Sequence, residues 1–166
     1  MKKIILLLLT ITVALFGVTK GQSTESPQLS EKGIGAIQIG IPLAEALKAA
    51  AGFGEVKKTE KMEEGDLYTI YEVVKNKEVL FLIDPMDEKI SRLRILSPQF
   101  KTDKNIGIGS TLAELLKAYP LLKIGPSEYS GMGACALSEK LGFSFFFKSE
   151  KPKPSDPVTL ILVFGR

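Results

Sequence analysis

The chain has 166 residues, of which 45% are hydrophobic and 25% are charged, and this composition is typical of one soluble globular domain. Because it contains no histidine and only one cysteine, the sequence excludes imidazole-based catalysis, the common zinc sites and an internal disulfide. The net charge of +3 comes from three lysines in residues 1–21, and the remainder has equal numbers of acids and bases, so we expect no nucleic-acid binding.

The amino terminus has the pattern of a signal peptide. Two lysines precede a run of mostly apolar residues, Ile4–Phe16, and small residues lead to a cleavage site near Gly21/Gln22. The run is shorter than the roughly 20 residues that a membrane-spanning helix needs, and no cysteine follows it to carry a lipid. We therefore expect residues 1–21 to direct export to the periplasm or outside the cell. The polar residues 22–32 predict a flexible leader, followed by a soluble domain without a stable membrane span.

A sequence repeat organises the rest of the chain, residues 33–166. Ile37–Ala49 and Ile106–Ala118 are identical at nine of thirteen positions, at a constant offset of 69. We interpret this match as two repeats within a single domain, residues 33–101 and 102–166.

The predicted elements follow a similar order in both repeats. Each repeat contains a short amphipathic helix, about Leu43–Ala51 and Leu112–Tyr119, which begins after Pro42 in one repeat and at a Thr111–Glu114 capping box in the other. The segment from Glu60 to Asp66 predicts an acidic loop. Alternating or continuous apolar residues predict strands at Ile34–Ile39, Leu67–Val74, Val79–Ile83, Lys89–Leu96, Leu121–Ile124, Gly133–Leu137, Gly142–Lys148 and Pro157–Phe164. The expected class is α+β, a tandem duplication of a β-α-β-β-β unit, with an antiparallel sheet and both helices on one face.

Several motifs suggest chemistry but favour a structural interpretation. Gly131–Ala136 matches the consensus sequence of a dinucleotide-binding turn, yet no helix has room to follow it. The segment therefore predicts the start of a strand. Cys135 has no histidine to activate it, and we expect an inert, inward-facing side chain. Asp84, Asp87 and Glu88 lack the spacing of a calcium loop and predict a solvated turn. We expect no catalytic residue, no metal site and no cofactor.

A binding surface is predicted on the strand Lys89–Leu96. Arg92 and Arg94 alternate there with apolar residues, so they point away from the side that the helices would cover. Tyr68 and Tyr71 point to opposite sides of a neighbouring strand, so one of them shares this open face, and we select Tyr71. Arg and Tyr are enriched at protein interfaces. The candidate binding residues are therefore Arg92, Arg94 and Tyr71, with an ordinary polar sheet face as the alternative.

The last strands carry more apolar residues than one covered face requires. Phe143 to Phe147 and Val158 to Phe164 are apolar on both faces, whereas a strand covered on one side should alternate. The second face must be covered by the amino-terminal segment or by a partner. That partner would be another protein, an envelope component, or a second copy of this chain in a homodimer.

The segment that enters each helix, with Ile-Gly followed by Leu-x-Glu-x-x-Lys, resembles exported domains related to the β-lactamase inhibitory protein. It is also similar to the small SmpA/OmlA lipoprotein of outer-membrane barrel assembly. The resemblance covers Ile37–Ala51, Ile106–Pro120 and the element order, and it implies a repeat fold that presents a sheet face to a partner protein. This chain has no lipobox cysteine and no disulfides, and no partner-contacting residue of those families carries over.

These observations predict an exported, non-enzymatic binding protein, either an envelope accessory protein or an inhibitor of a secreted enzyme. The alternative is a secreted hydrolase that uses Asp or Glu as acid and base, which requires two carboxylates facing each other across a cleft.

Overall fold

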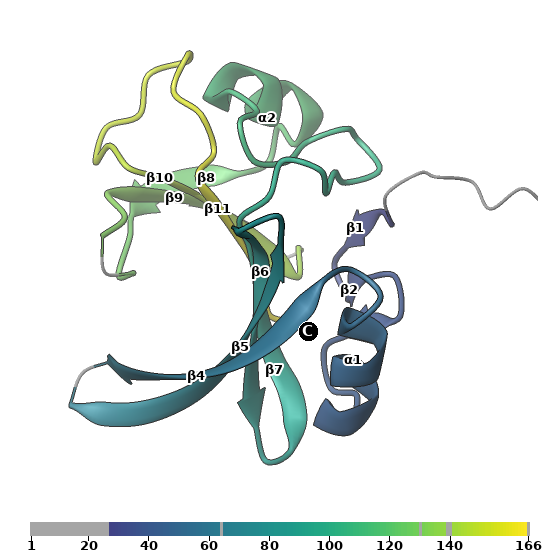
Figure 1. Cartoon of the computed structure of the whole chain (residues 1–166). Coiled ribbons are helices and arrows are strands. Elements are labelled where there is room, and N and C mark those ends of the chain that lie inside the picture. Colours follow the sequence, from purple (N-terminus) through teal and green to yellow (C-terminus); the bar gives the residue numbers. More distant parts are fainter. Residues whose placement is uncertain (1–26, 64, 130, 139–140, 166) are drawn as a thin grey trace, which may run out of the picture.

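The computed structural model describes residues 27–63, 65–129, 131–138 and 141–165; the predicted signal peptide lies outside this part (Figure 1). Within these ranges no helix is long and apolar enough to cross a membrane. The elements in chain order are β1 (Leu29–Ser30), β2 (Gly33–Ile34), β3 (Ile37–Gln38), α1 (Leu43–Ala50), β4 (Glu55–Glu63), β5 (Asp66–Lys75), β6 (Glu78–Met86), β7 (Lys89–Ile95), α2 (Leu112–Ala118), β8 (Lys123–Pro126), β9 (Ala134–Leu137), β10 (Phe143–Phe147) and β11 (Leu160–Val163).

Strands β4 to β11 form one antiparallel sheet of eight strands in the order β4-β5-β6-β7-β11-β10-β9-β8, and β1 to β3 form a separate sheet of three. β7 and β11 lie side by side at the centre. From each of them, successive antiparallel neighbours lead outward to an edge strand, β4 on one side and β8 on the other. The sheet curves strongly, and the ends that carry β4 and β8 both turn toward the left in Figure 1.

The main core is a single hydrophobic cluster against one face of this sheet. Alternate residues of the central strands enter it, including Leu93 and Ile95 of β7 and Ile161 and Val163 of β11. A smaller cluster lies on the other face and contains Cys135, Phe146, Leu160 and Leu162. Side chains that alternate between the faces account for the two clusters.

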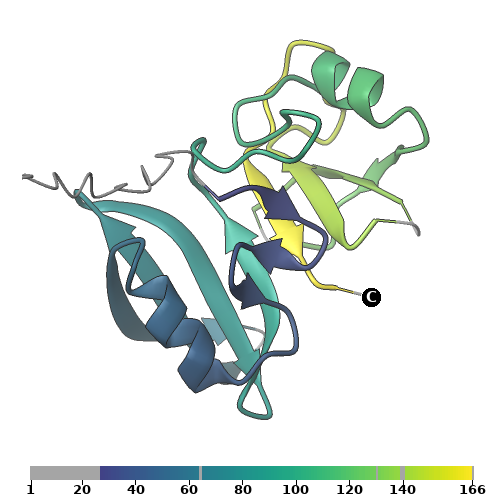
Figure 2. The same cartoon turned by 90° about the vertical axis from the view of Figure 1, so that its right-hand side faces the viewer.

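The expected class, α+β with both helices on one sheet face, is wrong. The helices have only eight and seven residues, too few to form a layer over eight strands. Each helix is followed by four sheet strands, not by the three of the expected β-α-β-β-β unit. Figure 2 shows β1 to β3 (purple) and α1 (blue) in front of the large sheet, with α2 (green) displaced to its upper end. The small sheet and loops close much of the main core, through Leu29, Ile34, Phe100, Ile106 and Val158. The protein is therefore mostly β.

The two copies of the repeated sequence make matching main-chain contacts. The N–H of Gly40 donates to the carbonyl of Ile90 at 2.8 Å, and the N–H of Gly109 donates to the carbonyl of Val158 at 2.9 Å. Both glycines have a positive φ, 85° and 84°, which an L side chain rarely adopts. These hydrogen bonds join the turn before each helix to the chain at or just before a central strand.

Both predicted helix starts are confirmed. α1 begins after Pro42, which makes no side-chain cap. α2 begins after Thr111, whose Oγ1 accepts from the N–H of Glu114 at 3.2 Å while the Glu114 carboxylate accepts from the N–H of Thr111 at 2.8 Å. The hydrogen bond from the main-chain N–H of Thr111 is the largest cause that lowers the pKa of the Glu114 carboxyl, and the hydrogen bond from the Thr111 hydroxyl is the second. This capping box supplies partners for N–H groups that a helix end leaves free.

The predicted hairpin and the strand that follows it are confirmed as β5, β6 and β7. Positive φ angles occur at Asn76 and Lys77 between β5 and β6, and at Asp87 and Glu88 between β6 and β7. Two such residues in succession are the signature of a type I′ turn, whose twist matches that of the flanking strands.

Two segments that were expected to be irregular contain strands. The predicted acidic loop from Glu60 to Asp66 is wrong, because most of it belongs to the long hairpin β4–β5. Charged residues are tolerated there because β4 is an edge strand. Leu29 and Ser30, within the predicted leader, form β1, and Leu29 is buried in the main core.

Gly133 provides a test of the packing near β9. A Cβ at this position would lie 2.4 Å from the main-chain nitrogen of Glu150 and 2.6 Å from the carbonyl oxygen of Lys148. We expect Gly133→Ala to lower the free energy of unfolding by about 1–3 kcal/mol, because main-chain atoms must move apart. Gly125→Ala is the matched control, since nothing lies within 4 Å of its added Cβ. Equal melting temperatures for the two variants would contradict this account.

Candidate functional site

The arginine face is the side of the eight-stranded sheet that points away from the main core. Glu72 of β5 pairs with Leu82 of β6, Leu82 pairs with Arg94 of β7, and Arg94 pairs with Leu162 of β11. Directly paired residues lie on the same face of a sheet, so these four side chains define this surface across four neighbouring strands. Arg92, two residues before Arg94, lies on it too.

A bulge in the β6–β7 hairpin brings Asp84 to the arginines. The pairing steps from Pro85–Ile90 to Asp84–Arg92, which leaves Ser91 as the extra residue. The hydroxyl of Ser91 donates to the carbonyl of Asp84 at 2.9 Å. Pro85 has no N–H to donate to the ladder, and a bulge is a place in a sheet where proline is tolerated.

Two guanidinium groups share one carboxylate at this point. Asp84 Oδ2 lies 2.8 Å from Nε of Arg94 and 3.1 Å from Nε of Arg92. The Asp84 and Arg94 side chains are only 6% and 9% exposed, whereas that of Arg92 is 38% exposed. Arg92 is therefore the arginine of this pair that reaches the surface.

The ion cluster is expected to stabilise the sheet less than well-packed apolar residues would. Asp84 Oδ1 is buried and has no hydrogen-bond partner among the described residues. A buried acceptor without a donor destabilises a fold by about 1–3 kcal/mol, and well-packed apolar residues are often more stabilising than a buried ion pair. We therefore interpret the cluster as a feature with a functional role.

Part of the arginine face is covered by the chain itself. The guanidinium of Arg94 lies over the ring of Tyr129, 5.4 Å from its centroid, and this ring packs at 5.5 Å against Phe146. Tyr129 and Met132 both pack on the smaller cluster. The extra apolar face of β10 and β11, expected to be covered by the amino-terminal segment or a partner, is thus covered here by residues that precede β9.

Of the three predicted binding residues, Arg92 and Arg94 lie together and Tyr71 does not join them. Tyr71 pairs with Ile83, which in turn pairs with Leu93, and all three side chains contact the main core. Alternation along β5 instead places Tyr68 on the side of the arginines, where it is 44% exposed. The sequence alone could not distinguish these tyrosines.

Two further ion pairs lie on this side of the sheet. Lys61 of β4 lies 3.8 Å from Glu72 of β5, and Lys57 lies 3.3 Å from Glu55 within β4. Their partly exposed side chains make these ion pairs weak contributors to stability.

The other candidate groups are placed as ordinary structural residues. Asp87 and Glu88 occupy the β6–β7 turn, and the described residues contain no cluster of acids or cysteine that could hold a metal ion. Cys135 lies on β9, as predicted, and is buried with 6% exposure. Burial is the main cause that raises the pKa of its thiol, and the nearby charge of Glu128 raises it further.

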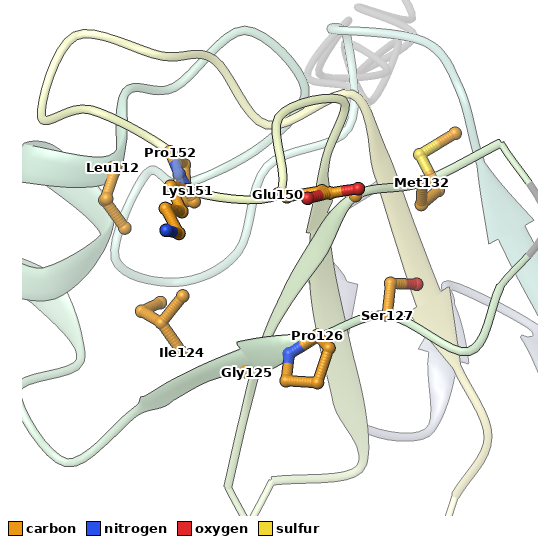
Figure 3. A pocket seen from close by; sticks show the side chains of 10 residues that line it. Leu112, Ile124, Gly125, Pro126, Ser127, Met132, Glu150, Lys151 and Pro152 are labelled. Carbon is orange, nitrogen blue, oxygen red and sulfur yellow. The ribbon is translucent and has the colours of Figure 1, made fainter.

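A separate cavity of about 650 Å³ lies beside the edge strand β8 (Figure 3). Leu112 at the start of α2, Ile124 of β8 and Met132 give it apolar walls, while Glu150 and Lys151 supply one acid and one base. It contains none of the predicted site residues.

The two arginines should differ in their effect on stability. We expect Arg94→Met to lower the free energy of unfolding by about 3–5 kcal/mol, because it breaks a buried ion pair. Arg92→Met should change it by no more than about 1 kcal/mol, since solvent screens this half-exposed side chain. Chemical denaturation of both variants tests this, and a loss as large for Arg92→Met as for Arg94→Met would contradict it.

Cys135 should react slowly in the folded protein. Because its pKa is raised, its thiolate fraction at pH 8 is smaller than that of an ordinary thiol, and burial limits access. We expect iodoacetamide to modify it much more slowly than in denaturant, with a rate that increases with pH. Equal rates in the native and unfolded protein would contradict this expectation.

Comparison with known proteins places the fold among solved structures without assigning a function. The chain is similar to the crystal structure of the uncharacterized protein yfeY from Escherichia coli, with a TM-score of 0.63 and 21% identity over 82% of this chain and 99% of that chain. At this identity the likeness shows the fold alone. No curated protein matches. Residues 20–159 match the family described as a protein of unknown function, DUF1131. Since this match spans most of the sequence, the chain belongs to the DUF1131 family.

Proposed function

We propose that this protein is an exported, non-enzymatic binding protein that contacts a partner protein through the arginine face. The single observation that carries the proposal is the unequal exposure of Arg92 and Arg94 around one buried carboxylate. Asp84, which is also bound to Arg94, forms an ion pair with Nε of Arg92, and the Arg92 side chain remains 38% exposed. An arginine positioned in this way on a partly apolar surface has the properties of an interface hot spot.

The edges of the sheet are less suited to a partner than its face. At one edge, β8 has four residues and ends at Pro126, which offers no N–H to an added strand. At the other, β4 carries Lys57, Lys58, Glu60 and Lys61, and such charges discourage strand addition. Recognition through side chains of the arginine face is therefore better supported than recognition through main-chain pairing.

Export rests on the signal-peptide pattern of residues 1–21, and it makes an envelope or secreted protein the natural partner. An accessory protein of the cell envelope and an inhibitor of a secreted enzyme both fit this role. A hydrolase is less well supported, because Asp84, the most buried carboxylate among the residues that the structure describes, is already bound to two arginines.

Site-specific photo-crosslinking tests the proposed face. A benzophenone side chain replaces Tyr68 on the arginine face or Leu121, which is 75% exposed and outside the proposed face. In cells that express the full chain, we expect the Tyr68 position to form a specific crosslinked product and the Leu121 position not to form it. Mass spectrometry then identifies the partner.

Charge changes supply the control for this experiment. Arg92→Glu should reduce the crosslinked product at least fivefold, while Lys48→Glu on the exposed side of α1 should leave it unchanged. A product of equal yield from both benzophenone positions, or none from Tyr68, would contradict the proposal.

A further inference from the structure

We propose that a second site, a pocket beside α2, binds the phosphate group of a phosphate monoester. The pocket has a volume of about 560 Å³ and is lined by the loop that precedes α2 and by the helix itself. Its charged lining consists of Lys101, Lys104, Glu114 and Lys117, and we call it the lysine pocket. It shares no described residue with the arginine face, so this inference goes beyond the proposed protein-binding role.

The lysine pocket has more bases than acids. Within the described part of the chain, none of its three lysines forms an ion pair. Glu114 is the only acid among the described lining residues, and its carboxylate is already engaged by the N–H of Thr111 at 2.8 Å. Asp103, next to Lys104 in the chain, lines a neighbouring pocket and accepts from the hydroxyl of Tyr119 at 3.5 Å. The described lining of the lysine pocket therefore has a surplus of two positive charges.

Two of the lysines are held in place by groups that do not neutralise them. Nζ of Lys101 donates to the carbonyl of Ile108 at 3.4 Å, and Nζ of Lys104 donates to the carbonyl of Ala118 at 2.8 Å. The stem of Lys101 also packs over Gly107, where an added Cβ would lie 2.6 Å from its Cδ. An ammonium group has three N–H donors, so each of these two lysines keeps its charge and two donors for a ligand. Because they are already ordered, binding removes less side-chain entropy.

The types of side chain favour phosphate over carboxylate. The described lining contains three lysines and no arginine. A planar carboxylate is matched best by the fork of a guanidinium, whereas an ammonium group acts as a point charge and suits a phosphate oxygen. Above its second pKa of about 6, a phosphate monoester carries nearly two negative charges on three oxygens. Its charge thus equals the surplus of the lysine pocket.

The first copy of the repeat supplies a matched control. At the offset of 69 residues, Glu45 and Lys48 of α1 correspond to Glu114 and Lys117 of α2. Lys48 is exposed, as Lys117 is, but it does not line the lysine pocket. A change at Lys48 therefore removes the same charge from the same helix position at a different place in the fold.

Titration of the full chain with glycerol 3-phosphate at pH 8 tests the proposal. The readout is the main-chain ¹⁵N–¹H signals of Gly107 and Gly109, and succinate, a dicarboxylate of the same charge, is the comparison. At constant ionic strength we expect saturable shifts with glycerol 3-phosphate and an affinity for succinate that is about fivefold lower or less. No shift with glycerol 3-phosphate, or equal affinity for the two dianions, would overturn the proposal.

Variants locate the bound phosphate. Lys117→Gln and Lys101→Met should each reduce the affinity for glycerol 3-phosphate about fivefold, because each removes one charge from the site. Met keeps the apolar stem that packs over Gly107. Lys48→Gln should bind as the wild type does, and unchanged melting temperatures show that each variant is folded. Wild-type affinity in both Lys117→Gln and Lys101→Met would overturn the proposal.

Vesicles distinguish a lipid headgroup from a soluble phosphate monoester. Phosphatidylcholine vesicles with phosphatidic acid present this group, and vesicles of phosphatidylcholine alone do not. Sedimentation of the full chain that requires phosphatidic acid and decreases in Lys117→Gln identifies a lipid source, and its absence identifies a soluble one. Either result supports the phosphate site once the titration has succeeded.

The crosslinking experiment keeps this proposal separate from the protein-binding role. Lys117→Gln should leave the crosslink from position 68 unchanged. A crosslink that fails in the wild type removes the proposed function and leaves the phosphate titration as it stands.

Discussion

The antiparallel pairing of β7 with β11 is the constraint on which the rest of the structure depends. It joins the strands of the first half, β4 to β7, to those of the second half, β8 to β11, in one sheet. Its register places Leu93 opposite Val163 and Arg94 opposite Leu162. A slip of one residue would move Leu93 and Ile95 out of the main core and turn the arginines into it. The hydrophobic core and the charged surface are thus fixed by the same set of hydrogen bonds.

The face of the sheet that points away from the main core differs between its two halves. In the first half, that face carries charged residues arranged in pairs, such as Lys61 with Glu72. In the second half it carries Phe146 and Leu162, which need a cover, and Tyr129 and Met132 provide it. Arg94 lies at the boundary, because it bonds to Asp84 on one side and lies over Tyr129 on the other. This boundary is where a charged group and an apolar surface meet.

Local signals in the sequence were sufficient for elements whose cause is local. Pro42 and the Thr111–Glu114 pair fix the helix starts through φ and through hydrogen bonds within three residues. The alternation of Leu93 and Ile95 with the arginines was enough to predict that Arg92 and Arg94 share a face. The run of apolar residues around Cys135 was enough to place it on a strand, which is β9 in the structure.

Features that depend on distant pairing could not be predicted in the same way. The expected helical layer failed because helix length, not helix existence, determines what covers a sheet, and Leu29 and Phe100 took that role. The choice of Tyr71 failed because its face is set by its partner Ile83 in β6. The role of Asp84 was missed, since simple counting back from the Asp87–Glu88 turn pairs it with Ser91, and only the extra residue brings it opposite Arg92.

The extra residue, Ser91, also makes the direction of the Arg92 side chain independent of the conformation of the β6–β7 turn. Ile90, before Ser91, and Leu93, after it, both enter the main core although they are three positions apart, which an uninterrupted strand does not permit. The alternation of β7 side chains between the two faces of the sheet therefore shifts by one residue at Ser91, inside the strand, rather than at the turn. Evolution can vary the turn at Asp87 and Glu88 while the direction of Arg92 stays the same, provided that Ser91 is neither lost nor joined by another residue.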